Sequence, residues 1–540
     1  MPCGLRGQPC FFRRLSPESL PSPRKSDFHQ QSTAAMNGAE SLLRTLLASG
    51  VDVCFMNPGT SEMQFVAALD RVPEMRGVLC LHETVCAGAA DGYARMTGRP
   101  AATLLHLGPG LANGLSNFHN ARKARSPVVN IVGEHSTAHL RYDAPLTADV
   151  EAFARPVSGW VRTLDRPGSM GAAAAEAVRE ARRPPGQVAS LIIPADHSWS
   201  EAGEPAAPAA VETRPLPAES NLRGATCILA SGEPAAFFLG GTAASRTGIE
   251  AAARTGLPVF LNRYTGRVPR GRPWAFARRV AYFPEPAEAM LQGLKHLILV
   301  EADAPVSFFG YPGRRSTLAP PGCRLHVLAA HNEDGVAALE SLGGNSFLPE
   351  PVAPVTIPPD GPLTPESLGA VLAALLPADA IVSDEMVSSG ESVNQALSGA
   401  APHDLLPVTG GSIGQGLPVA LGAALACPHR KVVALEADGS AMYSLQALWT
   451  MARESLDVVA VIFANRRYRI LDIEMKRTGA GPIGPHGDRM IDIGSPALDW
   501  ISLSHGLGVE AARAATVAEF AALLTRALAA KGPCLIEAQL

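Results

Sequence analysis

The 540-residue chain has few charged and few aromatic side chains, 18% and 5% of its residues, and no excess of basic ones. With 46 Lys and Arg against 50 Asp and Glu, the formal charge of −4 argues against nucleic acid as the main ligand. No apolar run reaches about 18 residues, so we expect no membrane partner. Collagen-like and disordered classes are excluded, because 47% of the residues are hydrophobic and the 51 glycines follow no period.

Cysteine is also scarce. The nine cysteines are an odd number and form no Cys-x-x-Cys pair, which argues against a disulfide framework. We therefore expect reduced, mostly buried thiols and a cytoplasmic protein. Residues 1–35 differ from the rest, being rich in basic residues and serine, and we interpret them as a disordered tail or upstream extension. A transit peptide is the alternative.

Helical and strand patterns alternate from Met36 onward, which predicts parallel sheets covered by helices. Two Pro-rich stretches, 201–222 and 347–366, interrupt this alternation and read as linkers. We therefore predict an α/β protein of three doubly wound parallel-sheet domains, covering residues 36–200, 223–346 and 362–540.

The last of these segments carries the most specific motif. A strand pattern ends at Asp438-Gly439-Ser440 and, after a predicted helix, a second strand pattern ends at Asn465. This spacing places Asp438 and Asn465 at the carboxyl ends of two parallel strands, where open α/β sheets bind ligands. Carboxylate and amide oxygens suit Mg²⁺, while Gly439 and a helix N-terminus would accept a diphosphate. An Asp-Gly-Ser by itself is also an ordinary turn.

Together with His82-Glu83 (followed by AGAADGYARMTG) and the Gly-rich segment 410–414, this motif resembles the thiamine diphosphate enzyme family. The resemblance extends over essentially all of 36–540. It implies that Asp438, Asn465 and the backbone carbonyl of Arg467 hold Mg²⁺ against the cofactor diphosphate, which Gly439 and Ser440 contact. Ala437 replaces the family's usual Gly.

The resemblance assigns four further cofactor contacts. Glu83 would be the catalytic glutamate that binds N1′ of the aminopyrimidine, a role that requires a buried carboxyl group. The Gly411 carbonyl would accept from the 4′-amino group, Ile413 would hold the cofactor in its V shape, and the Ser388 hydroxyl would bind the diphosphate. A carboxylate at a helix N-terminus, a core Ile and an exposed loop serine are the corresponding structural interpretations.

The local sequence is nearest to acetolactate synthase large subunits, but NPGTSE and LHLGPGLANGLSN also resemble benzoylformate decarboxylase. The second comparison implies that His106 is an active-site histidine, that Thr60 contacts substrate and that Glu474 replaces an aromatic lining residue. A second active-site histidine of the decarboxylase has no counterpart, because the matching stretch reads SFFGYPG (307–313). A structural histidine at a strand end is the alternative for His106.

The resemblance implies a thiamine diphosphate- and Mg²⁺-dependent enzyme that acts on a small 2-oxo acid, with acetolactate synthase-like decarboxylation and carboligation. Simple decarboxylation and a non-catalytic thiamine diphosphate-binding homologue are the alternatives. Some family members carry FAD in the central domain, where Gly240-Gly241 is a weak dinucleotide signal, so FAD stays open. Because the family shares each cofactor between subunits, we expect a homodimer or a homotetramer.

Overall fold

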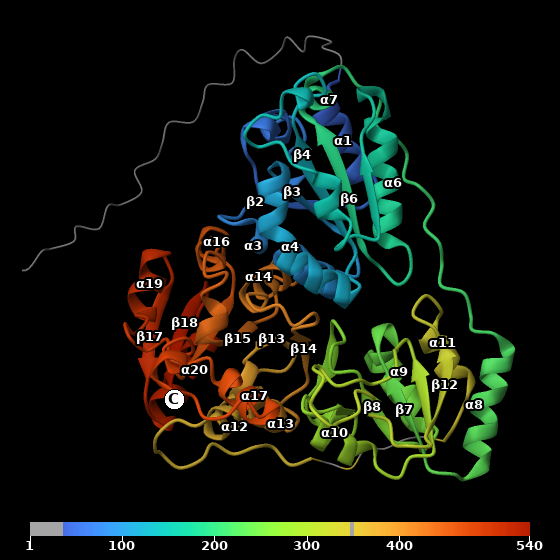
Figure 1. Cartoon of the computed structure of the whole chain (residues 1–540), viewed down its shortest axis with the longest axis vertical. Coiled ribbons are helices and arrows are strands. Elements are labelled where there is room, and N and C mark those ends of the chain that lie inside the picture. Colours follow the sequence, from blue (N-terminus) through green and yellow to red (C-terminus); the bar gives the residue numbers. More distant parts are fainter. Residues whose placement is uncertain (1–35, 346–349, 351) are drawn as a thin grey trace, which may run out of the picture. The chain divides into compact units, whose positions relative to one another are not determined.

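Three parallel-dominated sheets carry the fold (Figure 1), which confirms the predicted α/β class. The structure, a computed structural model, describes residues 36–345, 350 and 352–540. The predicted extension over residues 1–35 lies outside this part. Within it, no helix combines the length and apolar character needed to cross a bilayer. All seven cysteines of the described chain are free thiols, but only Cys54, Cys80 and Cys86 are buried, so the expectation that most of them are buried is wrong.

The first sheet has six parallel strands in the order β2-β1-β3-β4-β6-β5. Its strands are β1 (Val53–Asn57), β2 (Arg76–Leu79), β3 (Ala101–Leu105), β4 (Val128–Glu134), β5 (Trp160–Thr163) and β6 (Val188–Pro194). Its helices are α1 (Gly38–Ala48), α2 (Met63–Leu69), α3 (Glu83–Thr97), α4 (Leu107–Ala124), α5 (Val150–Ala154), α6 (Met170–Arg182) and α7 (Ala195–Trp199). The short turn η1 (Thr60–Glu62) follows β1. Strands such as β4 and β6 are buried along their whole length, as expected for a parallel sheet covered on both faces.

The second sheet has five parallel strands in the order β10-β8-β7-β11-β12. They are β7 (Ala235–Leu239), β8 (Val259–Leu261), β10 (Arg278–Arg279), β11 (His296–Val300) and β12 (Arg324–Ala329). The accompanying helices are α8 (Glu219–Ser231), α9 (Arg246–Arg254), α10 (Pro284–Leu291) and α11 (Gly335–Ser341), with the turn η4 (Gly241–Ala244) directly after β7. Helix α8 begins inside the stretch that the sequence predicts as a linker, because its apolar residues Ala225 and Ile228 pack into the core.

The third sheet has seven strands in the order β17-β18-β16-β15-β13-β14-β9. They are β13 (Ala380–Glu385), β14 (His403–Pro407), β15 (Val432–Ala437), β16 (Val458–Ala464), β17 (Glu510–Ala514), β18 (Cys534–Gln539) and the antiparallel edge strand β9 (Val268–Arg270). The helices are α12 (Pro365–Leu375), α13 (Gly390–Leu397), α14 (Gly416–Ala426), α15 (Asp438–Ala441), α16 (Ala447–Arg453), α17 (Arg469–Thr478), α18 (Pro485–Asp488), α19 (Trp500–Gly506) and α20 (Val517–Ala529). Strand β9 comes from the middle of the chain, and no local pattern predicts that it joins this sheet.

Each sheet has a point where the chain reverses the direction in which it adds strands. In the first sheet this point lies between β1 and β3, in the second between β7 and β11, and in the third between β13 and β15. Open parallel sheets bind ligands in the crevice beyond the carboxyl ends of the strands at such switch points. We therefore expect ligand-binding residues at these three switch points.

Helix α3 packs directly against α14, joining the first sheet to the third within one chain (Figure 1). Two glycines, one on each helix, allow this close approach. A side chain at Gly92 would collide with the backbone of Val419, and one at Gly422 would collide with the backbone of Ala89. Glycine has no Cβ, so the two helix backbones come into contact there.

Candidate active site

Glu83 lies at the switch point of the first sheet, at the start of α3. His82 caps this helix, its Nδ1 accepting from the Thr84 N–H at 3.1 Å. The Glu83 side chain is buried, at 7% exposure. Its two carboxylate oxygens accept from the side-chain amides of Asn57 and Asn113, each at 3.0 Å. The burial agrees with what a catalytic glutamate needs. The two amide donors were not predicted, because they reach Glu83 from other elements: Asn57 ends β1 and Asn113 lies on α4.

His106 follows β3 at the same switch point and is paired with a buried carboxylate that the sequence analysis missed. Its Nδ1 lies 2.8 Å from Oε2 of Glu62 and 3.1 Å from the Ser61 hydroxyl. Glu62 is only 3% exposed and also accepts from the Gly59 N–H at 2.7 Å. The contacts with Glu62 and Ser61 both involve Nδ1, so Nε2 is left for other chemistry. Thr60 is exposed next to Gly59, which contacts the His106 ring.

Asp438 and Asn465 lie beside each other at the carboxyl edge of the third sheet. Ala437 at the end of β15 pairs with Phe463 of β16, so the two residues follow adjacent strand ends. The Asp438 carboxylate accepts from the backbone N–H groups of Gly439 at 2.9 Å and Arg466 at 2.6 Å. Burial raises the pKa of Asp438, and these two N–H groups partly offset that effect. The helix predicted over 443–454 is α16, which begins later, at Ala447, and a separate short helix, α15, begins at Asp438 itself.

The segment 465–468 bends around this edge. Arg466 has a left-handed backbone with φ of 56°, and the Asn465 side-chain oxygen accepts from the Arg467 N–H at 2.9 Å. The Arg467 side chain is bound to Asp472 and Asp488, at 2.5 and 2.7 Å, so its backbone rather than its charge faces the edge. The carbonyl oxygen of Arg467 already accepts from the Arg469 N–H at 2.8 Å.

The donor set at this edge fits the Mg²⁺ and diphosphate that the family implies. Among the described residues, no group of three or more His, Cys, Asp or Glu side chains could hold a metal by itself. One carboxylate, one amide and one carbonyl leave positions open for phosphate oxygens and water, which is how Mg²⁺ is usually bound. The buried residues Gly439 and Ser440 begin the short helix α15 beside Asp438.

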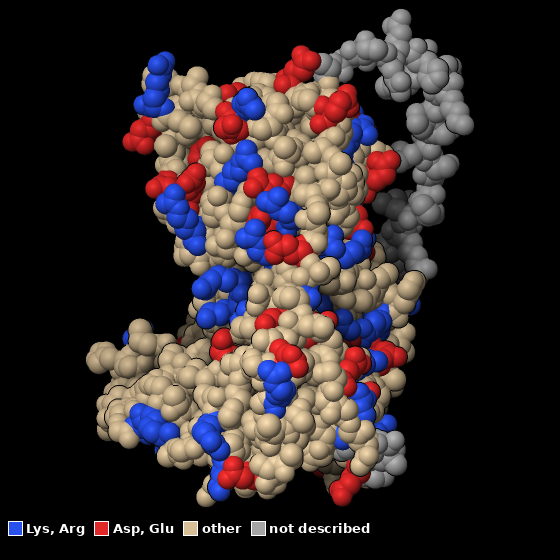
Figure 2. Space-filling view, turned by 90° about the vertical axis from the view of Figure 1, so that its right-hand side faces the viewer, with Lys and Arg blue, Asp and Glu red and all other residues tan. Residues whose placement is uncertain are grey.

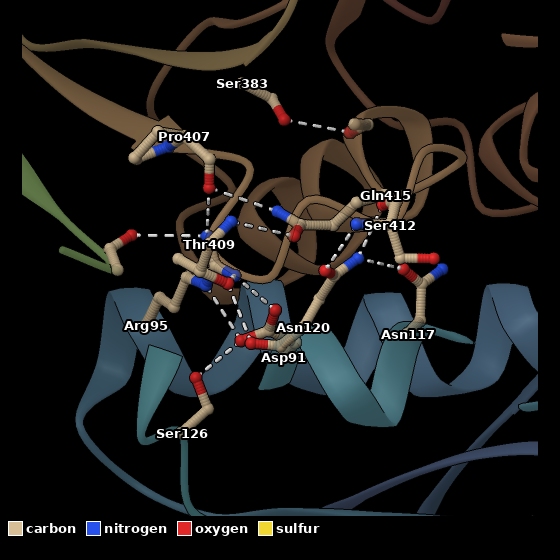
Figure 3. Close-up of polar contacts among 12 residues, drawn as sticks. Asp91, Arg95, Asn117, Asn120, Ser126, Ser383, Pro407, Thr409, Ser412 and Gln415 are labelled. Atoms are coloured by element: carbon tan, nitrogen blue, oxygen red, sulfur yellow. Dashed lines mark hydrogen bonds and ion pairs between the residues drawn. The ribbon is translucent and has the colours of Figure 1, made fainter. Parts of the chain in front are cut away.

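The loop 410–414 is held by helix α4 of the same chain. Figure 3 shows Asn117 and Asn120 on this helix pointing at the loop. The Asn120 side chain donates to the Ser412 carbonyl at 2.8 Å and accepts from the Ser412 N–H at 3.2 Å. Asn117 donates to the Gly414 carbonyl at 3.0 Å, and His119 contacts the Gly410 carbonyl at 3.1 Å.

These contacts leave Gly411 and Ile413 free. Within the described chain the Gly411 carbonyl accepts no hydrogen bond, while the carbonyls of Gly410, Ser412 and Gly414 each have a partner. Gly411 is exposed with φ of 77°, a left-handed conformation that favours glycine, and the Ile413 side chain is half-buried. The free carbonyl and the adjacent apolar side chain are the features required for the proposed pyrimidine contacts.

Two carboxyl groups lie beneath this loop. Glu385 ends β13 and accepts from the N–H groups of Gly414 at 2.6 Å and Gly416 at 2.5 Å. Its strand partner Glu436 is fully buried, and its oxygens have no hydrogen-bond partner in the described chain. Burial raises the pKa of Glu385 to about 7, and burial together with the Glu385 charge raises the pKa of Glu436. Ser388, half-buried in the turn η6 (Val387–Ser389), follows Glu385 at the same switch point.

The second sheet contributes an aromatic wall. The Phe308 ring packs against Gly411, where it leaves no room for a side chain, and its centroid lies 5.2 Å from that of Tyr282. Tyr311 donates from its hydroxyl to Glu474 on α17 at 3.0 Å. Phe308 and Tyr311 both belong to the stretch 307–313, which has no counterpart of the decarboxylase's second active-site histidine. The hydrogen bond from Tyr311 connects Glu474 to this same stretch.

The fold and these two edges define the class of protein. A buried glutamate held by amides at one switch point, and an aspartate–asparagine edge below a glycine-rich loop at another, are the parts of a thiamine diphosphate-binding enzyme. Sequence profiles agree: the N-terminal thiamine pyrophosphate-binding domain matches residues 36–153 and the C-terminal one matches residues 389–538. The chain belongs to the thiamine pyrophosphate enzyme family.

Full-length relatives place the chain within this family. It is 49% identical over 514 residues to a protein of Mycobacterium tuberculosis that carries the name 'Putative acetolactate synthase large subunit IlvX'; the match covers 93% of this chain and 98% of the relative. It is 30% identical to benzoylformate decarboxylase of Pseudomonas aeruginosa, over 90% of this chain and 96% of that one. The thiamine diphosphate-dependent 4-hydroxybenzoylformate decarboxylase of Rhodococcus jostii RHA1 superposes with a TM-score of 0.82 at 25% identity, covering 93% and 99% of the two chains.

Proposed function

We propose that this chain is a thiamine diphosphate- and Mg²⁺-dependent enzyme that decarboxylates a small 2-oxo acid and joins the remaining acyl fragment to a second carbonyl compound. The buried Glu83 carboxylate carries this proposal. A protein that only binds the diphosphate has no use for a buried carboxyl group held by two amides at the other end of the cofactor, and such a group is costly to bury. Similarity to IlvX favours carboligation.

The geometry supports a proposed role for each of these residues. When bound, thiamine diphosphate supplies the carbon nucleophile and the electron sink for loss of CO₂. Glu83 holds or releases a proton at N1′, and Asn57 and Asn113 fix the orientation of its carboxylate. Asp438, Asn465 and the Arg467 carbonyl hold Mg²⁺, while Ser388, Gly439 and Ser440 face the diphosphate. Gly411 and Ile413 receive the pyrimidine end.

His106 is proposed as the proton carrier for the substrate. The Glu62 carboxylate orients its ring through Nδ1, which leaves Nε2 to give or take a proton. Thr60 lies next to the contact between Gly59 and His106, and this position supports the proposal that it binds the substrate carboxylate. Phe308 and Glu474 are proposed to line one side of the substrate site.

Changing Glu83 to Gln tests the catalytic assignment. The variant keeps the shape and loses the proton, so cofactor should still bind while turnover falls by about 10²–10⁴-fold, the usual scale of acid–base help. Hydrogen–deuterium exchange at C2 of the bound cofactor gives a readout before substrate is added. Wild-type exchange in this variant would contradict the role of Glu83.

Simple decarboxylation is a second candidate, because the Glu62–His106 pair can protonate the product as well as assist carbon–carbon bond formation. A screen of 2-oxo acids separates the two. CO₂ release is followed with thiamine diphosphate and Mg²⁺, and the organic products are identified by mass spectrometry. A free aldehyde as sole product supports the decarboxylase, whereas a 2-hydroxyketone or a 2-hydroxy-3-oxo acid supports the carboligase.

We also propose a homodimer or homotetramer in which each cofactor lies between two subunits. Glu83 and Asp438 belong to different sheets, and the resemblance divides the cofactor between subunits. Mixing a Glu83→Ala chain with an Asp438→Ala chain, followed by unfolding and reassembly, should then restore about a quarter of wild-type activity, because half the dimers are hybrid and each has one intact site. Because Asn117 binds both Thr84 and Gly414 of one chain, a site within a single chain is the alternative, and it predicts no recovery in exchanged protein.

A further inference from the structure

The switch point of the second sheet contains a carboxylate whose hydrogen bonds are all made inside the chain. Glu301 follows β11 and is 1% exposed. One of its oxygens accepts from the Thr242 N–H at 2.8 Å and from Arg214 at 2.9 Å. The other accepts from the Thr242 hydroxyl at 2.6 Å and the Gly335 N–H at 3.2 Å.

The donors that Glu301 uses are those that a nucleotide phosphate uses in a doubly wound sheet. Backbone N–H groups after the first strand, a nearby hydroxyl and an arginine make an anion-binding cradle at the switch point. Gly240 and Gly241, the weak dinucleotide signal of the sequence, form the turn of this cradle. A side chain at Gly241 would collide with a carboxylate oxygen of Glu301. The carboxylate therefore lies where a phosphate would approach the backbone.

The backbone of Glu301 is bent to make this possible. Its φ is 49°, in the left-handed region that a residue with a side chain adopts at an energetic cost. The conformation is held by the four contacts of the carboxylate and by the Glu301 N–H, which donates to Ala329 at 2.9 Å. Arg214 comes from the Pro-rich stretch after the first sheet and also donates to the His331 carbonyl at 3.0 Å, which closes the cradle from the opposite side.

We propose that Glu301 takes the place of a nucleotide phosphate, so that the second sheet of this chain holds neither FAD nor another adenine nucleotide. The FAD that some family members carry does not fit here, because its phosphates would meet a buried carboxylate and find the backbone donors taken. This inference concerns the second sheet alone and does not depend on the reaction proposed above.

The cleft beside Glu301 remains open. It is a cavity of about 630 Å³ that extends from Glu301 past Tyr264 and Phe308 to Gly410. Arg122, Lys123 and Arg125 of the first sheet's α4 and its C-cap also line it. Figure 2 shows this side of the molecule hollowed at its middle, with basic side chains gathered there. An anionic ligand in the cleft is therefore a realistic competitor, and the experiment must separate it from occupation of the cradle.

The first test uses the wild-type chain at full length, saturated with thiamine diphosphate and Mg²⁺ so that the third sheet's diphosphate site is filled. We expect no flavin or adenine nucleotide in the supernatant after denaturation, and no binding of added FAD or ADP in calorimetric titrations up to about 1 mM. Stoichiometric flavin in the purified protein, or ADP binding with a Kd below about 0.1 mM, would overturn the proposal. If thiamine diphosphate itself does not bind, the proposed function fails while this titration can still be evaluated.

The second test opens the cradle. Glu301→Ala should gain at least about tenfold in affinity for ADP over wild type, and pyrophosphate should raise its melting temperature. Asp303→Ala is the matched control, because Asp303 lines the same cleft but is exposed and contacts Arg125 and His331 instead of the cradle. A gain in Asp303→Ala equal to that in Glu301→Ala would locate the anion in the open cleft and contradict the proposal. If Glu301→Ala does not fold, the wild-type titration decides.

Discussion

The switch points of the second and third sheets each hold a buried carboxylate, but the two carboxylates differ in their partners. In each, a buried carboxylate follows a central parallel strand and accepts backbone N–H groups: Glu301 after β11 and Asp438 after β15. Glu301 also has an arginine within hydrogen-bond distance, whereas no side-chain cation donates to Asp438 in the described chain. One carboxylate is paired with a cation within the chain, and the other has no side-chain cation as a partner in the described chain.

The difference shows that a strand-end carboxylate is not by itself a ligand site. A buried charge needs a partner, and the partner decides what the charge does. Arg214 supplies it at the second sheet, where the result is a closed cradle. At the third sheet the partner would be Mg²⁺. We expect this cation because no side-chain cation pairs with Asp438 in the described chain.

The largest effect is expected from Asp438→Ala. Loss of the carboxylate leaves the metal and diphosphate charges poorly compensated, which costs about 3–5 kcal/mol, or about 10²–10⁴-fold in cofactor affinity. Stability without cofactor should change little. Titration of the apo-protein with thiamine diphosphate at fixed Mg²⁺ measures the loss, and Asn465→Ala, which removes a neutral ligand, should lose less. Unchanged cofactor affinity in Asp438→Ala would contradict the claim that Asp438, unlike Glu301, takes part in cofactor binding.

Arg214→Met should show the reverse pattern. It leaves the Glu301 carboxylate buried without its cation, which we expect to lower the free energy of unfolding by about 3 kcal/mol. Thiamine diphosphate affinity should stay at the wild-type value, because the cradle takes no part in it. Urea unfolding followed by fluorescence measures the first quantity and calorimetry the second. The double change Arg214→Met with Glu301→Met should cost less than Arg214→Met alone, since no charge is left behind.

The smallest effect concerns acid stability and the opposite, amino end of the third sheet. Burial lowers the pKa of His403 on β14 to about 4, with the nearby Arg270 adding to the shift and Asp404 opposing it. The unfolded chain binds this proton near pH 6.5 and the folded chain only near pH 4, so stability is full above pH 6.5 and falls as the pH is lowered. About 2 kcal/mol should be lost between pH 6.5 and 5.

The measurement is urea unfolding across this pH range for wild type and His403→Asn. The asparagine amide can keep the hydrogen bond that Nδ1 makes to the Ala401 carbonyl at 2.9 Å, and it does not titrate. We expect a flatter pH profile for this variant, while the exposed His429→Asn serves as control and should follow wild type. A profile for His403→Asn as steep as that of wild type would contradict the assignment of this acid sensitivity to His403.

Much of the site could be predicted from local pattern. The Asp438 and Asn465 motif depends on strand ends, and strand ends are visible as apolar runs followed by turn residues. Asn57, Glu62 and Asn113 were missed for a different reason. They act through side chains that meet Glu83 or His106 from other elements, and no spacing in the sequence indicates those contacts. Phe308 likewise reaches Gly411 from the second sheet.

The sequence by itself determined the α/β class, the three sheets and the carboxyl-edge positions of Glu83 and Asp438, because these follow from hydrophobic periodicity and chain direction, which are local. Only the tertiary structure decided which charges are paired. Whether Glu301 faces Arg214 or a phosphate depends on where a distant Pro-rich stretch crosses the second sheet. Whether Gly411 keeps a free carbonyl depends on which loop atoms helix α4 binds. Such pairings join residues that lie 87 positions apart for Arg214 and Glu301 and 292 apart for Asn120 and Ser412, and they are fixed by packing geometry rather than by pattern.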